Sequence, residues 1–550
     1  MQIAQKWLVQ KANQSLLFLL VGGLLFRGLI AFWLYPTFDE AYYYLYSLHL
    51  NWSYFDHPVM VALTTGLGPW LTGVVSQFTI RLGALICYTG SLVLLYLTGG
   101  KLFSAQAALF TLAIATISPI FAISFGILSL PDAPLMLFWS GSLYCAAEEF
   151  FPQPDVLKEK SGSSSIYLPS YRLAILGIVV GLACLSKYHG FVLGFGLVGF
   201  CLTSPGHRRA LLSPWTWLGL GLFIITISPI LLWNLHHDWV SLRFQSERAV
   251  PTGGYSLLGV AGVCLAEIGY LFPTIGLPLW WVSLRVALAK TIQFFFQKSR
   301  TYQQNLGDAQ LLILWLSLPL TLGFTLMGGY RQILPAWAMP GFWGVTLLLG
   351  QQVTIWEQQW RCWVKRWLLG SGLMVGTILL ILLLQVTTGI VQKPSQYSIM
   401  GGFLAPENDP STELIDIEQI RYGFVKSPIL REALEKSSFI FTNRYYLGGL
   451  IAMSLQPITN TPITCFDIGQ DLRGFAFWSK PDQWLGKDAL YITTGAFNNR
   501  EDLMASYRHH FSSLTEIATI PINRGGVQIN IVHVYQAQTL LKPYPRSYGI

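Results

Sequence analysis

Residues 16–58 read LLFLLVGGLLFRGLIAFWLYPTFDEAYYYLYSLHLNWSYFDHP. The stretch to Tyr35 is apolar and about 20 residues long, which is enough to cross a hydrocarbon core about 30 Å thick. The stretch from Thr37 to Pro58 changes abruptly to acids, tyrosines and an Asp-His-Pro turn. We therefore predict a membrane span, followed by a polar and aromatic segment at the membrane surface.

The composition extends this pattern over most of the chain. Of the 550 residues, 53% are hydrophobic and only 11% are charged, against roughly 25% charged in an ordinary soluble domain. We predict about 11 spans, at residues 16–35, 79–98, 105–122, 132–148, 173–187, 190–204, 213–233, 256–284, 309–328, 333–350 and 367–390. The eighth is long enough to be broken, and residues 59–77 are also apolar, so the number could rise to 13.

The positions of Lys and Arg set the orientation, because cytoplasmic loops are enriched in these residues. With the N-terminus in the cytoplasm, the inner segments hold Lys6, Lys11, Lys101, Lys158, Lys160, Arg172, Arg208, Arg209, Arg285, Lys290, Lys298, Arg300, Arg361, Lys365 and Arg366. The outer loops hold Arg81, Lys187, Arg243, Arg248 and Arg331. The segment Thr37 to Pro58 is then outside. The net charge of +8 is spread without a basic tract, so we expect no nucleic-acid partner.

After residue 392 the sequence becomes mixed and charged, and strand-like runs alternate with helical ones. Strands are predicted at Ser438 to Thr442, Ile463 to Phe466, Ala489 to Thr493, Leu514 to Ile520 and Val527 to Val534. Helices are predicted at Arg444 to Leu455 and Arg500 to Phe511. We predict a membrane domain over residues 1–392 and a small soluble α/β domain over residues 393–550, which an odd number of spans places outside.

Acidic residues gather on the predicted outer side. Asp39, Glu40 and Asp56 lie in the first outer segment, and Asp132 opens the fourth span within Pro131-Asp132-Ala133-Pro134. Carboxylates at membrane level are costly, so they persist where they are paired, bind a metal or are used in function. An interfacial belt would explain the tyrosines but not three acids. Asp132 could be a helix cap, although its placement on the same side as Asp39 favours a functional carboxylate.

Basic and histidine residues on the same side leave alternatives open. Lys187 violates the charge bias, so it either pairs with a carboxylate such as Asp132 or holds a phosphate. Arg243 and Arg331 could bind phosphate through the two parallel hydrogen bonds of a guanidinium. His236 and His237 are weak evidence for a metal, because neighbours on a helix point about 100° apart.

These motifs resemble the polytopic glycosyltransferases of the protein O-mannosyltransferase and aminoarabinose transferase type, which have the GT-C fold. The resemblance covers roughly residues 15–350, and its motifs are Asp39-Glu40-Ala41-Tyr42-Tyr43, Tyr54-Phe55-Asp56-His57-Pro58, Pro131-Asp132-Ala133-Pro134, Leu185-Ser186-Lys187-Tyr188, and Ser228-Pro229 before Trp233-Asn234 and His237-Asp238-Trp239. It implies a mainly α-helical polytopic enzyme of a bacterial inner membrane. Such an enzyme, surrounded by membrane lipids, would move a sugar from a polyprenyl-phosphate donor to a lipid, glycan or protein hydroxyl at the outer face, with inversion.

The resemblance also implies roles for individual residues. Asp39 corresponds to the carboxylate that acts as a base or orients the acceptor, and Asp132 to a second catalytic carboxylate. The predicted contacts to substrate or phosphate are Glu40, Tyr43, His57, Lys187, Arg243 and Arg331. Asp56 and His237 are the candidate ligands of a divalent ion, Mg, Mn or Zn, and no other cofactor is expected. Aminoarabinose transferases carry Lys where this chain has His57, a departure that affects the acceptor side and the identity of the metal.

Two other classes of protein fit part of this pattern. A transporter or flippase for a polyprenyl lipid or a small solute would also place charged residues in a membrane protein, but at midplane sites within an inverted repeat. The sequence shows neither that repeat nor acids near span centres. A noncatalytic subunit, whose C-terminal domain binds a partner, is the third class. We predict the glycosyltransferase.

Overall fold

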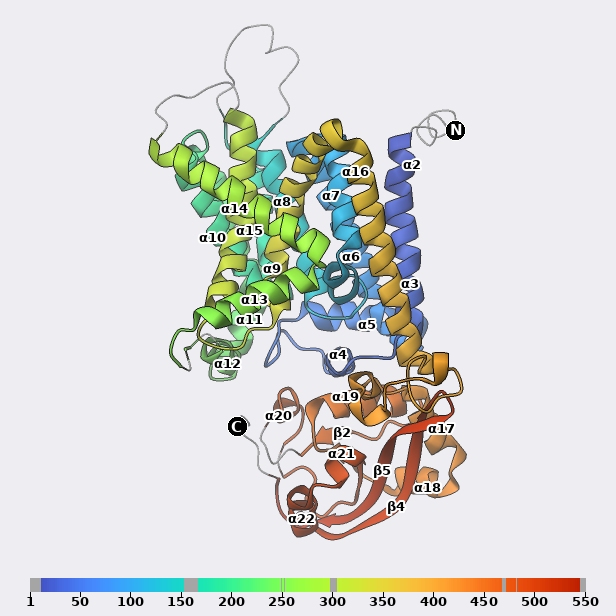
Figure 1. Cartoon of the computed structure of the whole chain (residues 1–550). Helices are drawn as coiled ribbons and strands as arrows, with labels where there is room; N and C mark the ends of the chain where they lie inside the picture. Colours follow the sequence, from blue (N-terminus) through green and yellow to red (C-terminus); the bar gives the residue numbers. More distant parts are fainter. Residues whose placement is uncertain are drawn as a thin grey trace, which may run out of the picture. The chain divides into compact units, whose positions relative to one another are not determined.

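The computed structural model describes residues 11–152, 167–248, 250–251, 253–296, 304–466, 471–480 and 482–544 (Figure 1). Lys6, Lys158, Lys160, Lys298 and Arg300, which contributed to the predicted orientation, lie outside these residues. The chain divides into two compact units. Unit 1 comprises Met1–Gly28, Ala84–Ile127 and Pro131–Thr377, and unit 2 comprises Leu29–Gly83, Leu128–Leu130 and Ile378–Ile550. The polar segment Thr37 to Pro58 therefore shares a compact unit with the C-terminal region. The division at residue 392 between a membrane domain and a soluble domain stays a prediction.

The chain outside the C-terminal region is helical. The helices that lie in unit 1 or run into it are α2 (Lys11–Leu17), α3 (Gly23–Trp33), α6 (Gln77–Leu102), α7 (Ala105–Ile117), α8 (Asp132–Phe150), α9 (Arg172–Ser186), α10 (Phe191–Thr203), α11 (Pro214–His236), α12 (Val240–Glu247), α13 (Leu257–Tyr270), α14 (Pro273–Phe296), α15 (Gln304–Met327) and α16 (Met339–Thr388). Within the described part of the chain, six helices are long and apolar enough to cross a membrane. Every predicted span coincides with helix.

The correspondence between spans and helices is not one to one. The eighth predicted span is two helices, α13 and α14, because Phe272 has a φ of +72° and Pro273, which lacks an N–H, starts the second helix. The last two predicted spans lie in the two helical segments on either side of Trp360, which has a non-helical φ of −134° and ψ of 52° and interrupts the stretch labelled α16. Residues 59–77 contain α5 (Met60–Thr72), whose 13 residues are too few to cross a bilayer.

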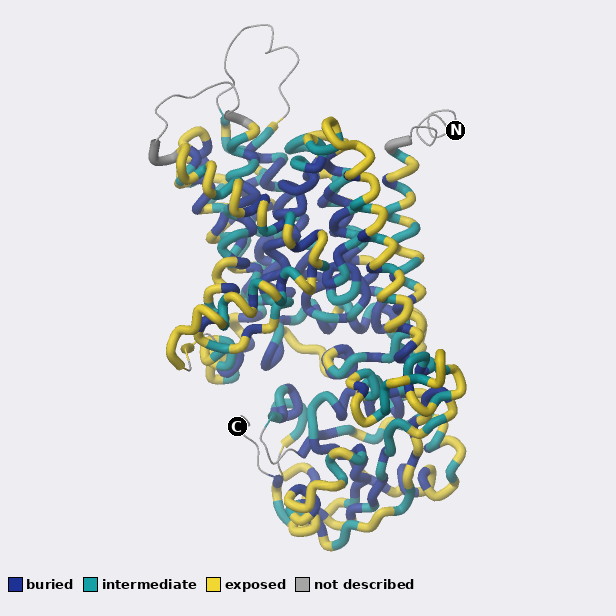
Figure 2. The backbone as a smooth tube through the Cα atoms, viewed as in Figure 1, coloured by how far each residue is buried: buried dark blue, intermediate teal, exposed yellow. Residues whose placement is uncertain are grey.

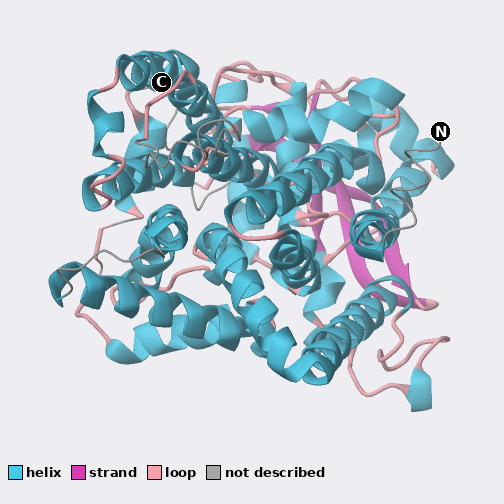
Figure 3. Cartoon of the chain, turned by 90° about the horizontal axis from the view of Figure 1, so that it is seen from above, coloured by secondary structure: helices cyan, strands magenta, loops and turns pink. Residues whose placement is uncertain are grey.

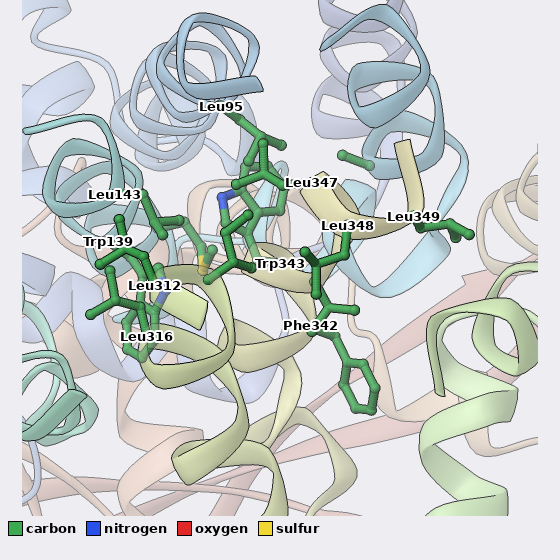
Figure 4. Packing of buried hydrophobic residues seen from close by; sticks show 14 of the residues in the cluster. Leu95, Trp139, Leu143, Leu312, Leu316, Phe342, Trp343, Leu347, Leu348 and Leu349 are labelled. Atoms are coloured by element: carbon green, nitrogen blue, oxygen red, sulfur yellow. The ribbon is translucent and has the colours of Figure 1, made fainter. Parts of the chain in front are cut away.

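The interior of unit 1 is closely packed around two tryptophans (Figure 4). Trp139 from α8 and Trp343 from α16 are fully buried, and Leu312 and Leu316 from α15 belong to the same cluster. The Trp343 indole N–H donates to the Ser140 hydroxyl over 2.8 Å, which satisfies a buried donor. This packing holds α8, and with it the backbone of Asp132 at its first turn.

The outer surface of the helices is apolar. On α16, Leu369, Leu373 and Leu382 are more than half exposed, and exposed residues recur along this helix in Figure 2. Extended apolar surface of this kind marks contact with a membrane or a partner. Together with the helix lengths, it supports an integral membrane protein.

The C-terminal part of unit 2 contains a five-stranded sheet among its described residues, in the order β2-β1-β3-β5-β4. The strands are β1 (Phe439–Thr442), β2 (Ile463–Cys465), β3 (Ala489–Thr494), β4 (Phe511–Arg524) and β5 (Val527–Leu540), and the sheet is magenta in Figure 3. The helices are α17 (Ile417–Lys426), α18 (Pro428–Lys436), α19 (Tyr445–Leu455), α20 (Phe475–Trp478), α21 (Gly495–Asn498) and α22 (Glu501–His510). Strands β2, β1 and β3 are parallel, and β3, β5 and β4 are antiparallel. All five predicted strands and both predicted helices are present.

Alternate residues of the strands serve two faces of the sheet, as the period of two requires. Ile440 and Leu490 face the hydrophobic cluster that contains Leu450 of α19, whereas Phe441 and Tyr491 face the cluster that contains Tyr507 of α22. Helices therefore cover both faces of the sheet, which is the α/β arrangement predicted for this region.

The first outer segment folds into α4 (Phe38–Leu48) and α5, and α4 packs on α19. The approach is close at Gly449, where a Cβ would lie 2.3 Å from the carbonyl carbon of Ala41. Ala41, Tyr42 and Leu450 are buried in one cluster. The C-terminal region thus supplies one wall of the core that positions the Asp39 motif.

Candidate functional site

Glu40 anchors the first turn of α4. Its carboxylate is fully buried and forms a two-point ion pair with Arg81, with both nitrogen to oxygen distances at 2.7 Å. It also accepts hydrogen bonds from the backbone N–H groups of Thr37 at 3.0 Å and Ser129 at 2.9 Å. Burial alone would raise the pKa of Glu40, but Arg81 and these hydrogen bonds lower it. We predicted a substrate contact for Glu40, and the structure instead gives both of its oxygens internal partners.

Asp56 is the second buried acid of the segment. Its Oδ1 accepts hydrogen bonds from the hydroxyls of Tyr46 and, at 3.5 Å, Tyr42, and its Oδ2 lies 3.2 Å from Nη1 of Arg473. The Gly474 N–H donates to the Tyr42 hydroxyl over 2.8 Å. The pKa values of Tyr42 and Tyr46 are raised well above that of an ordinary tyrosine, mainly because both side chains are buried and also because Asp56 is negatively charged. Both phenols therefore stay neutral and donate to Asp56.

Arg473 is the main residue of this site that the sequence did not reveal. It follows β2, has a left-handed φ of +46°, and places its guanidinium 3.8 Å from the centre of the Tyr445 ring. Its Nε lies 3.3 Å from Asp471. Arg473 is 417 residues from Asp56 along the chain, and no motif links the two. A non-glycine residue at positive φ is uncommon, but that signal is visible only in the structure.

Asp39 differs from both buried acids because its side chain is exposed on the first turn of α4. Its neighbour Phe38 packs on Tyr446 with ring centres 4.5 Å apart. Tyr43, one turn later, is buried and meets the His57 ring edge to face at 5.5 Å. Burial first, and then the charge of Asp39, raise the pKa of Tyr43. Asp39 is thus a solvent-accessible carboxylate on a rigidly held helix turn.

Unit 1 holds the predicted pair of Asp132 and Lys187. The Lys187 ammonium lies 2.9 Å from both Asp132 oxygens, and both residues are buried. This is the pairing that we gave as one of two alternatives for Lys187. The capping alternative for Asp132 is not observed, because Pro131 is the N-cap of α8 and makes no side-chain cap. Each charge compensates the other in a site where an isolated charge would be costly.

The remaining predicted residues of unit 1 lie after α11 and before α16. His237 Nδ1 bonds to the Trp233 carbonyl at 2.7 Å, and the His237 ring stacks on Trp233 at 4.1 Å. Arg331 donates from Nη1 to the carbonyl of Glu247 at 3.2 Å and to that of Arg248, which ties two loops together. Arg243 is exposed. Their predicted contacts to phosphate or metal stay predictions.

The predicted divalent ion does not fit Asp56 as the residues stand. Both of its oxygens already accept from phenol hydroxyls or face the Arg473 guanidinium, so a cation occupies the position that a metal would need. Across the residues that the structure describes, no three His, Cys, Asp or Glu side chains gather as a metal site. We derive no step through a metal, and the metal requirement stays a prediction.

Comparison with known proteins agrees with this architecture. The family model described as dolichyl-phosphate-mannose-protein mannosyltransferase matches residues 56–154 and 162–233. Lipid A galacturonosyltransferase RgtD of Rhizobium johnstonii is 25% identical over 313 residues, which are 56% of this chain and 59% of that relative. The alignment thus spans less than two thirds of the relative.

Two crystal structures of ArnT from Cupriavidus metallidurans have the same fold. The apo form gives a TM-score of 0.62 at 14% identity and covers 96% of this chain and 98% of ArnT. The form bound to undecaprenyl phosphate gives 0.61 at 13% identity, with 94% and 97% covered. This chain has the fold of ArnT. The resemblance seen in the motifs, and the predicted polytopic fold with a C-terminal α/β region, are confirmed.

The family match begins at Asp56 and includes His57, Asp132 and Lys187. It does not reach Asp39 or Glu40, whose assignment rests on the motif and on the geometry of α4. Unit 2 brings Asp39, Glu40, Tyr43, Asp56 and His57 together. Unit 1 brings Asp132 to Lys187.

Proposed function

We propose that this protein transfers a sugar from a polyprenyl-phosphate donor to an acceptor hydroxyl at the extracytoplasmic face of a bacterial inner membrane, with inversion. The observation that carries the proposal is the exposed Asp39 carboxylate on a helix turn that Glu40 and Arg81 hold in place. Of the three acids between Thr37 and Pro58, Glu40 and Asp56 are buried in ion pairs with arginine. Asp39 is the acid with an accessible side chain.

The reaction requires a base and a good leaving group. The acceptor oxygen attacks the anomeric carbon while Asp39 takes the hydroxyl proton, for which hydrogen-bond reach matters more than an unusual pKa. The bond from that carbon to the phosphate oxygen breaks, and the electron pair leaves with the polyprenyl phosphate. A single displacement of this kind inverts the configuration at the anomeric carbon.

The phosphate gains negative charge as it leaves, and cations that are already in position would stabilise that charge. We assign this role to Lys187 and to the exposed Arg243, with Arg331 holding the neighbouring loops. Asp132 holds the Lys187 side chain in place through the pair at 2.9 Å. It is a positioning carboxylate in this proposal.

The names of the relatives support the choice of substrates. One relative is named for lipid A, one matching structure contains undecaprenyl phosphate, and the matched family is named for a dolichyl-phosphate sugar. We therefore propose a glycolipid acceptor, with lipid A as the first to test. A glycan or protein hydroxyl is the alternative that an acceptor screen would reveal.

The test is sugar transfer by the purified full-length protein in lipid nanodiscs, with radiolabelled polyprenyl-phosphate sugars. We expect Asp39→Asn to lower kcat by about 10²-fold or more, the scale of general base catalysis. Asp502→Asn is the matched control, because Asp502 is an exposed acid in the first turn of α22. Undiminished transfer by both Asp39→Asn and Asp132→Asn would reject the site.

One observation favours transport as a second candidate function. Arg27 in α3 and Glu267 in α13 are buried within predicted spans, where ionisable residues often mark transport pathways. Glu267 lies near the middle of the predicted eighth span, residues 256–284, so the prediction that no acid lies near a span centre was wrong. Proteoliposomes loaded with the labelled donor separate the two functions, because a transporter moves the intact donor across the membrane whereas a transferase cleaves it.

A further inference from the structure

A short segment soon after α16 exposes several large apolar side chains. It comprises residues 396–403, which we call the apolar turn, and it lies within unit 2. Met400 is fully exposed, Phe403 is 80% exposed, and Tyr397 and Ile399 are each more than half exposed. Single exposed apolar residues are ordinary, whereas a group of them marks a surface that contacts a partner or a membrane.

Backbone hydrogen bonds hold the apolar turn in place. The Ile399 N–H donates to the carbonyl of Ile390, two residues beyond the end of α16, at 2.8 Å. The Gln396 N–H donates to the carbonyl of Gly525 at 2.9 Å, and Gly525 lies in the connection between β4 and β5. The turn is therefore tied both to the end of the helix and to the hairpin of the sheet.

The tip of the turn has an uncommon backbone conformation. Met400 has a φ of +53°, in the left-handed region that non-glycine residues seldom adopt. Gly401 and Gly402 follow with φ of +79° and +70°, which glycine adopts readily. Strained conformations persist where the surrounding structure fixes them, and they are concentrated at functional sites. Here the strained residue is the one whose apolar side chain is fully exposed.

The exposed surface of the apolar turn continues the exposed surface of α16. The last turns of this helix belong to unit 2, and their apolar residues Ile381, Leu382 and Leu384 are exposed. These turns end the last predicted span, so their surface suits contact with hydrocarbon. Because Ile399 is bonded to Ile390, the turn begins where that surface ends.

The charge of this part of the chain also suits a lipid surface. Lys393 is the one charged residue between Leu380 and Pro406, and it is exposed. Lysine side chains reach from apolar surroundings to the polar headgroups, and tyrosine, here Tyr397, is enriched at membrane interfaces. Loops that face water are usually polar, which this turn is not.

We propose that the apolar turn inserts into the membrane interface at the end of α16, with Met400 and Phe403 among the lipids. The partner is the lipid surface itself, rather than a second copy of the chain or another protein. Insertion would hold the hairpin of β4 and β5 close to the membrane, because the turn is hydrogen-bonded to Gly525. This contact does not depend on the proposed function.

The experiment measures the membrane depth of the turn in the full-length protein, in nanodiscs of phosphatidylcholine and phosphatidylglycerol. An NBD fluorophore is attached to Met400→Cys in a Cys362→Ser background, because Cys362 is the exposed cysteine of the chain. The Cys362→Ser protein carried through the same labelling measures the background. We expect emission shifted to the blue, with a strong loss of emission to nitroxide-labelled lipids and little loss to aqueous iodide.

Leu541→Cys in the same background is the matched control. Leu541 is 59% exposed and directly follows β5, whereas Gly525 lies just before the other end of this 14-residue strand. At about 3.3 Å per residue, the strand separates the two positions by about 45 Å. At Leu541 we expect strong quenching by iodide and little quenching by the lipids.

A further variant tests whether the apolar side chains cause the insertion. Phe403→Asp, added to the labelled Met400→Cys protein, should increase quenching by iodide, because a charge at membrane level is costly. Phe403→Leu is the conservative control and should leave the label shielded. Undiminished shielding in folded Phe403→Asp would overturn the proposal.

Quenching by iodide at Met400→Cys to the extent seen at Leu541→Cys would also overturn it. So would shielding from both quenchers, and a dimer mass would then assign the turn to a second copy of the chain. Phe403→Cys supplies the same measurement if Met400→Cys does not fold. Because neither sugar donor nor acceptor is present, failure here would leave the proposed function intact, and loss of sugar transfer would leave this contact intact.

Discussion

The first-turn acids of α4 in unit 2 and the first-turn acid of α8 in unit 1 lie in different environments. On α4, Glu40 is buried against Arg81, so its neighbour Asp39 remains exposed on a fixed turn. On α8, Asp132 is itself buried and paired with Lys187. Adjacent residues of one motif therefore have opposite environments, with Asp39 exposed and Glu40 buried, and the motif alone does not tell these environments apart.

The largest loss of stability should follow from breaking the Glu40 pair. Glu40→Gln leaves the Arg81 charge buried without a counter-charge, and we expect a cost of about 3–5 kcal/mol in the free energy of unfolding. Thermal and denaturant unfolding in detergent measure it. The double variant Glu40→Gln, Arg81→Leu should recover part of the loss. A wild-type stability for Glu40→Gln would show that this pair does not fix the turn.

The Asp132 pair should show a mixed effect. Lys187→Met leaves Asp132 buried without its partner, so we expect a loss of about 2–4 kcal/mol in stability together with a loss of kcat in the transfer assay. Combining Lys187→Met with Asp132→Leu should restore stability but not transfer. If the double variant recovers transfer as well, the pair is structural and Lys187 does not act on the leaving phosphate.

A smaller effect is expected at Arg473, whose side chain keeps some exposure. Arg473→Gln removes the charge facing Asp56 and the contact over Tyr445, and we expect about 1–3 kcal/mol lower stability. The acceptor KM should rise more than kcat falls, because Arg473 packs on Tyr445, which contacts Tyr42 of the helix that carries Asp39. Arg473→Lys should recover part of the stability. If Arg473→Gln and Arg473→Lys change kcat equally and leave the acceptor KM unchanged, Arg473 does not have a positioning role.

The smallest effect is a dependence of stability on pH. The pKa of Glu40 is lowered in the folded state from the ordinary value of 4.5. The stabilisation from this group is therefore fully present above that ordinary value and is lost as the pH falls through the folded-state pKa. Unfolding temperatures of the wild type and Glu40→Gln, measured below pH 4.5, should converge as the pH is lowered. A constant difference between them would show that the carboxylate is not responsible.

Much of the fold could be predicted, because its determinants are local. Apolar runs of about 20 residues mark membrane helices, and alternating strands mark the sheet. The eighth span was predicted to be long enough to be broken, but the position of the break, before Pro273, was not predicted. The separation of the last two spans was predicted, because the polar stretch around Trp360 divides two apolar runs, and the helix is interrupted at this residue.

The site was predictable only in part. A charge against the membrane bias needs a partner, so a carboxylate such as Asp132 was one of two alternatives for Lys187, the other being a phosphate, and the pair with Asp132 is present. The pairing of Glu40 with Arg81 and that of Asp56 with Arg473 join residues far apart in the chain, and neither leaves a spacing signal. For the same reason the sequence placed Glu40 among substrate contacts and Asp56 among metal ligands.

The most direct test of the account compares Asp39→Asn with Glu40→Gln in the same nanodisc preparations, measuring both the kcat of sugar transfer and the unfolding temperature. The account predicts that Asp39→Asn loses about 10²-fold or more in kcat at nearly unchanged unfolding temperature, because its side chain is exposed. Glu40→Gln should lose mainly stability. Full transfer activity in folded Asp39→Asn would contradict the central claim that the exposed carboxylate of α4 is the base.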